Sequence, residues 1–169
     1  IAFCVDSVKD AYKGCLERGA TLVGSPLIIK DKSGSFSKAS IKSYGDCIHS
    51  FINNRDYKFW APNFIDRRKK QKDLQDTKIE LIDHVVTNVE VDKMDSWKEY
   101  YERIFGFSAF VRFDETDIST KYSSLKSVVV RSENWKVKLP INEPAEGLKK
   151  SQIEEYLDFN EGPGIQHIA

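Results

Sequence analysis

Two histidines in apolar, strand-like runs are the residues of this sequence best suited to chemistry. His84 follows Asp83 in a run rich in isoleucine and valine (residues 79–89), and His167 follows Gln166 near the end of the sequence. Neutral imidazoles on rigid strands are good ligands for a borderline metal ion such as Fe(II). Taken alone, a histidine in such a run is more often a core residue than a ligand, so the surrounding pattern must decide between the two interpretations.

The elements that would position these histidines follow a repeated pattern. An apolar run at residues 1–5 precedes residues spaced as on one face of a helix, and Gly19 ends that helix. The same order recurs from residue 79, where the helix ends at Gly106. Three strand-like runs follow each helix, namely 22–29, 36–44 and 47–53 in the first copy and 107–113, 122–131 and 135–141 in the second. The pattern predicts two βαβββ units of the α+β class, joined by a polar, basic stretch at about 61–77.

A short helix and a turn are expected just before the second histidine. Ser151 and Glu154 have the spacing of a capping box, and Ile153 lies on the expected packing face of the helix. The glycine- and proline-rich stretch 160–164 is typical of a turn before a final strand.

Charge and composition argue against several classes of partner. The 169 residues carry 26 Lys and Arg against 26 Asp and Glu, so the net charge is zero, and 40% of the residues are hydrophobic. This balance favours a globular protein without nucleic-acid or membrane partners, and the basic run at 67–70 is interpreted as a solvated linker. The three cysteines, Cys4, Cys15 and Cys47, have no metal-site or disulfide spacing. They are expected to be buried, reduced thiols of a cytoplasmic protein.

The sequence resembles the 4-hydroxyphenylpyruvate dioxygenase family of the vicinal oxygen chelate superfamily. The resemblance rests on the two histidine motifs and on the words that lie between them, which are Ser127-Val128, Pro140-Ile141-Asn142 and Ser151-Gln152. It implies a glyoxalase- or dioxygenase-like fold truncated at both ends. Residues 1–63 would be the last module of an N-terminal domain and 64–76 a linker. Residues 77–169 would be the first module of a catalytic domain plus the opening strand of the next.

The resemblance also implies roles for individual residues. His84 and His167, which are 83 residues apart, would occupy equivalent opening strands and bind Fe(II). The third ligand would be a glutamate beyond Ala169. His49 would be a buried histidine that binds no iron. The implied substrate contacts are Ser127, Pro140, Asn142, Gln152 and Gln166. Gln166 raises a difficulty, because neighbouring residues of a regular strand point to opposite faces.

The implied reaction converts 4-hydroxyphenylpyruvate and O2 to homogentisate and CO2 in tyrosine catabolism, and the full-length protein would be a homo-oligomer. The isolated fragment would be inactive without the third ligand. Three alternatives stay open: a hydroxymandelate synthase, which uses the same substrate; a non-catalytic binding module of the same fold; and a metal-dependent isomerase or lyase of the superfamily.

Overall fold

The computed structural model describes residues 1–65, 78–113, 124–145, 147 and 149–169. The expected linker at 64–76 and its basic run lie almost entirely outside these residues. Two compact units are present: one comprises Ile1–Lys42 and Ile48–Leu81, and the other Ser43–Cys47 and Ile82–Ala169. The assignment of residues 1–63 and 77–169 to two different domains of a longer protein stays a prediction.

The first unit is a βαβββ module. Its elements are β1 (Ala2–Cys4), α1 (Val8–Glu17), β2 (Leu27–Asp31), β3 (Gly34–Lys42) and β4 (Ile48–Asn53). The strand order is β1-β4-β3-β2, with β1 parallel to β4 and the other pairs antiparallel. Ser7 caps α1 by accepting a hydrogen bond from the Asp10 N–H, and Gly19 follows the helix with φ +90°, as predicted.

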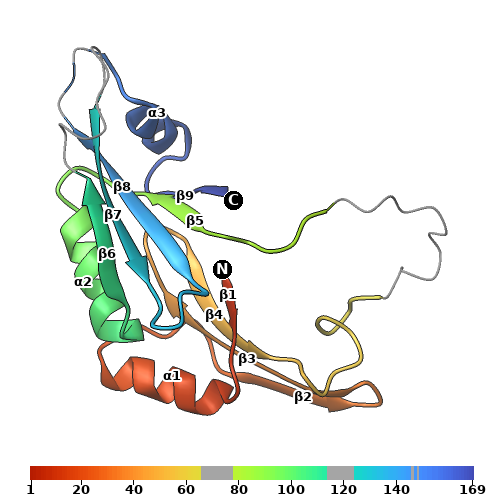
Figure 1. Ribbon diagram of the computed structural model, residues 1–169. Coiled ribbons are helices and arrows are strands. Elements are labelled where there is room, and N and C mark those ends of the chain that lie inside the picture. Colours follow the sequence, from red (N-terminus) through yellow and green to blue (C-terminus); the bar gives the residue numbers. More distant parts are fainter. Residues whose placement is uncertain (66–77, 114–123, 146, 148) are drawn as a thin grey trace. The chain divides into compact units, whose positions relative to one another are not determined.

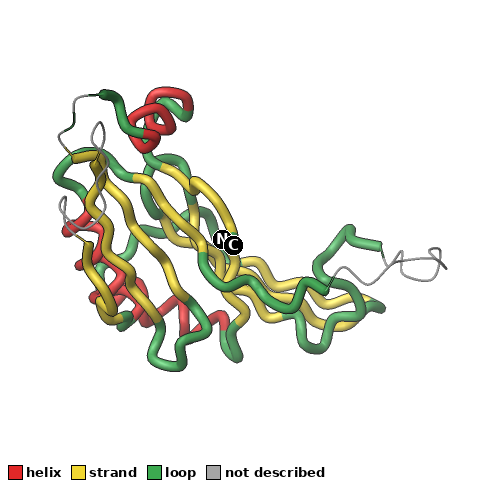
Figure 2. The backbone as a smooth tube through the Cα atoms, turned by 45° about the horizontal axis from the view of Figure 1, so that its top comes forward, coloured by secondary structure: helices red, strands yellow, loops and turns green. Residues whose placement is uncertain are grey.

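The second unit repeats the same order and adds one helix and one strand. Its elements are β5 (Val85–Asn88), α2 (Met94–Phe105), β6 (Ser108–Phe113), β7 (Ser124–Arg131), β8 (Lys138–Ala145), α3 (Gln152–Phe159) and β9 (Gly164–Ile168). The strand order is β6-β7-β8-β5-β9. Helix α2 runs along one face of this sheet (Figures 1 and 2). It packs Met94, Tyr101 and Ile104 against Val128, Val130, Leu139 and Ile141, all of which are buried.

Helix caps explain where α2 and α3 begin. The buried Glu143 carboxylate of β8 accepts a hydrogen bond from the Met94 N–H at 3.0 Å and so satisfies one of the free N–H groups at the start of α2. Ser151 and Glu154 form the predicted capping box at the start of α3. No helix in the described part of the chain is long and apolar enough to cross a membrane.

Several expected boundaries were wrong. The run at 22–29 becomes a strand only at Leu27, because Gly24 has φ +67° and Pro26 lacks an N–H donor. In the run at 79–89 only Val85–Asn88 is a strand. By contrast, β8 continues through Pro144 to Ala145. Pro144 lacks an N–H group, but β5 pairs with β8 only at Ile141 and Asn142, so no hydrogen bond from Pro144 to β5 is needed.

The cysteine expectation was also partly wrong. All three cysteines are free thiols, and Cys15 is buried, but Cys47 is only half-buried and Cys4 is exposed. Cys4 lies on β1, an edge strand of three residues whose middle residue alone is partly buried.

Candidate functional site

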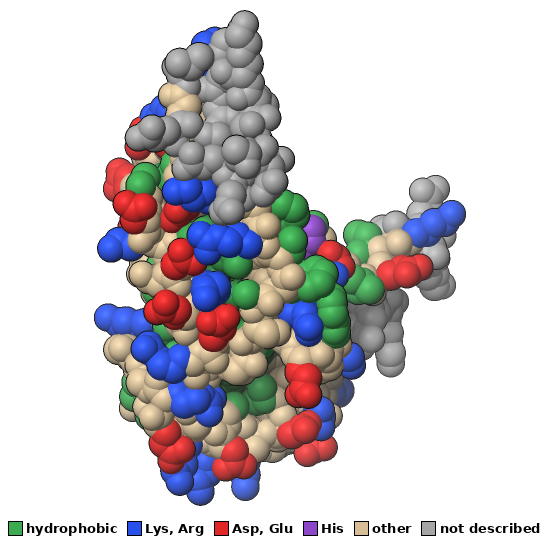
Figure 3. Space-filling view, turned by 60° about the vertical axis from the view of Figure 1, so that its left-hand side comes forward, with side chains coloured by type: hydrophobic (Ala, Val, Ile, Leu, Met, Phe, Trp, Pro, Cys, Tyr) green, Lys and Arg blue, Asp and Glu red, His purple; other side chains and the backbone are tan. Residues whose placement is uncertain are grey.

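The antiparallel pairing of β5 and β9 brings the two histidines together. Val86 lies opposite His167, and the backbones of His84 and Ala169 exchange hydrogen bonds of 3.0 and 3.3 Å. His84 and His167 are therefore diagonal neighbours on one face of the sheet. Their ring centroids are 5.8 Å apart, with the ring planes at 75°. Histidine reaches the molecular surface in Figure 3, and since His49 is fully buried, that surface belongs to this pair.

An oxygen atom of the preceding residue orients each ring. Asp83 Oδ2 lies 2.8 Å from His84 Nδ1, and Gln166 Oε1 lies 2.8 Å from His167 Nδ1. A carboxylate or amide oxygen accepts a hydrogen bond from a protonated Nδ1, which leaves the lone pair on Nε2. A histidine whose second nitrogen is held in this way is typical of metal sites. Both imidazoles are thus arranged to donate Nε2 to a cation.

Asp83 carries a negative charge beside this pair. Its carboxylate also binds the Lys138 ammonium group, and the bonds from Lys138 and His84 hold the pKa of Asp83 below its usual value. Asp83 therefore stays ionised at neutral pH and keeps its acceptor role toward His84.

A bulge resolves the difficulty with Gln166. Val86 pairs with His167 and Thr87 pairs with Ile165, so that Gln166 is an extra residue in β9 without a partner in β5. The bulge breaks the usual alternation, and the Gln166 side chain reaches the ring of its own neighbour. Gln166 and His167 can therefore serve the same site.

Three of the other predicted residues share the face of the histidines. Ser127 lies opposite Asn142 on β7 and β8, and Asn142 lies opposite Asn88 on β5. Pro140 is two residues from Asn142 and therefore faces the same way. Ser127 is buried, whereas Pro140 and Asn142 are half-buried. Gln152 is the exception, because it is exposed in the first turn of α3 and no contact links it to the histidines.

Asn88 is a residue that the sequence analysis missed. It is fully buried on the histidine-bearing face of β5, and its Oδ1 lies 3.5 Å from Asn142 Nδ2. The sequence signal that could have identified Asn88 is an asparagine inside the apolar run 85–89. Burying a polar side chain costs free energy unless the side chain forms hydrogen bonds.

His49 belongs to the first unit and has a different environment. It is 0% exposed, and its ring packs 5.4 Å from that of Phe3. Burial, with a smaller contribution from the amino group of Ile1, lowers the pKa of His49 to about 3. His49 is therefore a neutral core residue in this structure.

His84 and His167 would supply only part of the protein ligand set that Fe(II) usually has. Two oriented imidazoles suit a borderline divalent ion. Among the described residues, however, no group of three or more His, Cys, Asp and Glu side chains is placed to hold a metal. If these histidines bind Fe(II), a third protein ligand would come from outside these residues.

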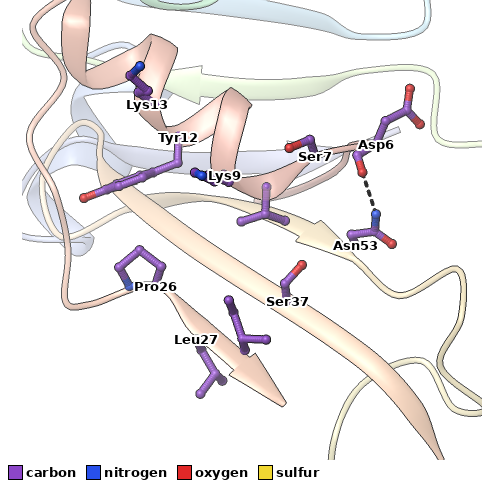
Figure 4. Close-up of a pocket in the computed structure, with 11 residues that line it drawn as sticks. Asp6, Ser7, Lys9, Tyr12, Lys13, Pro26, Leu27, Ser37 and Asn53 are labelled. Atoms are coloured by element: carbon purple, nitrogen blue, oxygen red, sulfur yellow. Dashed lines mark hydrogen bonds between the residues drawn. The ribbon is translucent and has the colours of Figure 1, made fainter. Parts of the chain in front are cut away.

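A hollow of about 530 Å³ lies in the first unit, between α1 and the strands that it covers. Figure 4 shows Tyr12, Pro26 and Leu27 on its walls. None of the predicted site residues lines this hollow, and its one carboxylate, Asp6, binds Arg55. It offers no arrangement for catalysis.

Comparison with known proteins places this geometry in a wider group. Residues 81–169 match the family model described as the Glyoxalase/Bleomycin resistance protein/Dioxygenase superfamily. The whole chain is 42% identical to 44% of a 4-hydroxyphenylpyruvate dioxygenase of Yarrowia lipolytica, and 40% identical to 43% of one from Tetrahymena thermophila. The chain thus spans less than half the length of these relatives. A mutant 4-hydroxymandelate synthase from Streptomyces coelicolor has the same fold over 99% of this chain and 47% of its own, with a TM-score of 0.74 and 19% identity.

Proposed function

Because this chain belongs to the Glyoxalase/Bleomycin resistance protein/Dioxygenase superfamily, we propose that it forms part of an Fe(II)-dependent dioxygenase that converts 4-hydroxyphenylpyruvate and O2 to homogentisate and CO2. The observation that carries the proposal is the pair His84 and His167, whose rings lie 5.8 Å apart with both Nδ1 atoms held by oxygen. The similarity of the whole chain to 4-hydroxyphenylpyruvate dioxygenases supports this choice of substrate.

Each residue of the site has a proposed task. His84 and His167 would hold Fe(II) through Nε2, and a glutamate from outside these 169 residues would complete the ligand set. Fe(II), when bound, supplies the redox chemistry that activates dioxygen. Asp83 and Gln166 keep the Nδ1 protons in place, so that neither histidine loses its free lone pair.

The remaining predicted residues would bind the organic substrate. The Ser127 hydroxyl and the Asn142 amide lie opposite one another and can orient polar groups of the substrate, while Pro140 supplies an apolar wall. Gln152 and Gln166 are proposed as further contacts, although Gln152 is exposed and would have to act from α3. A cytoplasmic location and a homo-oligomeric complete protein remain predictions.

Product analysis tests the proposal. The complete protein that contains this chain, loaded with Fe(II) and supplied with O2, should convert 4-hydroxyphenylpyruvate to homogentisate and release one CO2 per turnover. Formation of 4-hydroxymandelate would instead assign the protein to the synthase alternative. Absence of any product from an iron-loaded protein would favour a non-catalytic module.

A further inference from the structure

The back of the histidine-bearing strand pair carries a buried polar contact that the proposed reaction does not use. Thr87 lies between Val86 and Asn88 on β5, so its side chain points away from the histidine face. Its hydroxyl donates a hydrogen bond of 2.6 Å to the Tyr44 hydroxyl. Both residues are almost completely buried, at 1% and 0% exposure. A buried bond between two hydroxyls fixes the position of both groups, because breaking it would leave polar atoms without water.

Tyr44 belongs to a tight loop, residues 43–47, that is part of the second unit. The Cys47 N–H donates to the Tyr44 carbonyl at 3.0 Å, and the Ser43 N–H donates to the Cys47 carbonyl at 3.1 Å. The Tyr44 ring meets the Trp97 ring of α2 edge-on, with centroids 5.4 Å apart. The loop is therefore held rigidly against the second unit.

The same loop also contacts the segment that leads into β9. A Cβ atom on Gly45 would lie 2.6 Å from the Pro163 carbonyl oxygen, and Gly45 has φ +55°. Only glycine fits this close approach without displacing Pro163 or straining the turn. On the far side of the turn, Cys47 interacts with the backbone of Ile165 in β9. The loop thus contacts β5 through Tyr44, the residue before β9 through Gly45, and β9 itself through Cys47.

We propose that loop 43–47 is a positioning element that holds β5 and β9 in the pairing that brings His84 and His167 together. This inference rests on the proposed function, since it assigns the loop a role toward a metal bound by those histidines. The pairing of β5 and β9 contains an irregularity between Val86 and Thr87, and the loop braces the strands at that point. The hydrogen bonds between two strands are locally disrupted at a bulge. Contacts on the opposite face of the sheet, such as those of loop 43–47, therefore fix the relative position of the two imidazole rings.

The test uses two substitutions in the loop and a matched control for each. Tyr44→Phe removes the hydroxyl that accepts from Thr87 but keeps the ring on Trp97. Its control, Tyr57→Phe, removes a hydroxyl that donates to Asp31 at 2.9 Å in the first unit. Gly45→Ala forces the turn away from Pro163. Its control, Gly24→Ala, strains a residue with φ +67° whose added Cβ would meet nothing within 4 Å.

Binding of Co(II) to the complete protein gives a readout independent of turnover. We expect Tyr44→Phe and Gly45→Ala to weaken Co(II) affinity about tenfold and to change the visible absorption spectrum of the bound ion, as substitutions around metal-binding histidines do. Tyr57→Phe and Gly24→Ala should leave both unchanged. Should Gly45→Ala fail to fold, Thr87→Val should reproduce the loss, and Thr87→Ser, which keeps the donor, should retain wild-type affinity.

The outcomes separate this inference from the proposed reaction. Wild-type Co(II) affinity and spectrum in Tyr44→Phe and Thr87→Val would overturn the positioning role even if homogentisate forms. An equal loss in the Tyr57→Phe control would also overturn it, because the effect would then be one of general stability. If the complete protein makes no homogentisate but Tyr44→Phe and Gly45→Ala still weaken Co(II) binding, the positioning role is supported. Only the proposed dioxygenase activity is then rejected.

Discussion

At the scale of single residues, His84 and His167 differ from His49 in what surrounds their rings. The first two are partly exposed, adjacent and oriented through Nδ1, whereas His49 is buried beside Phe3. In the complete protein, His84→Ala or His167→Ala should abolish iron retention and turnover, because each removes one of the two proposed nitrogen ligands of the iron. His49→Ala should lower stability alone. Metal analysis of the purified variants measures the difference, and a full iron content in either of the first two would contradict the ligand assignment.

His49 should also make stability depend on pH. Burial lowers the pKa of His49 from its ordinary value of 6.5 to about 3, so at a pH between these values the unfolded chain takes up a proton that the folded chain excludes. The free energy of unfolding is therefore unaffected by protonation of His49 above pH 6.5. Between pH 6.5 and about 3 it falls by about 1.4 kcal/mol for each pH unit. Urea unfolding of the wild type and of His49→Leu at pH 7 and pH 5 checks this. The wild type should lose more stability than the variant, and parallel losses would show that another group is responsible.

At the scale of elements, the features that the sequence revealed are those encoded within a few residues. Ser151 and Glu154 predicted a capping box, and Gly106 predicted the end of α2, because each forms bonds within its own helix. The bulge at Gln166 could not be predicted, since it arises from the pairing of two strands that lie far apart in the sequence. For the same reason the contact of Glu143 with the first turn of α2 could not be anticipated, because Glu143 lies 49 residues away in the sequence.

The capping box of α3 offers a test at this scale. Ser151→Ala removes the hydroxyl that accepts from the Glu154 N–H, and it should cost the helix about 1 kcal/mol. Amide hydrogen exchange of residues 152–159 should accelerate accordingly. Ser7→Ala removes the equivalent cap of α1 and serves as the control, because exchange in α3 should not respond to it. Unchanged protection of α3 in Ser151→Ala would mean that packing of the buried Ile153, rather than the cap, holds the helix.

At the scale of the whole chain, the repeat seen in the sequence is also present in the strand orders. The order β1-β4-β3-β2 of the first unit corresponds strand for strand to β5-β8-β7-β6 of the second. Strand β9 lies beside β5, the opening strand of its module, and pairs with it in antiparallel fashion. That residues 164–169 open a further module stays a prediction, whereas the pairing of β9 with β5 is what brings the two histidines onto one face.

That arrangement leads to a prediction for the isolated 169-residue chain. Among its described residues β9 pairs only with β5, and no group of three or more His, Cys, Asp and Glu side chains is placed to hold a metal. The proposed pair of imidazoles would therefore leave the charge of Fe(II) without a carboxylate ligand. The chain should therefore retain Fe(II) less tightly than the complete protein and form no homogentisate. Iron content after gel filtration and oxygen uptake with 4-hydroxyphenylpyruvate measure both properties, with the complete protein as reference. His84→Ala in the isolated chain should remove whatever iron remains. Oxygen uptake coupled to the substrate by the 169 residues alone would show that the donors present in this chain suffice for the reaction.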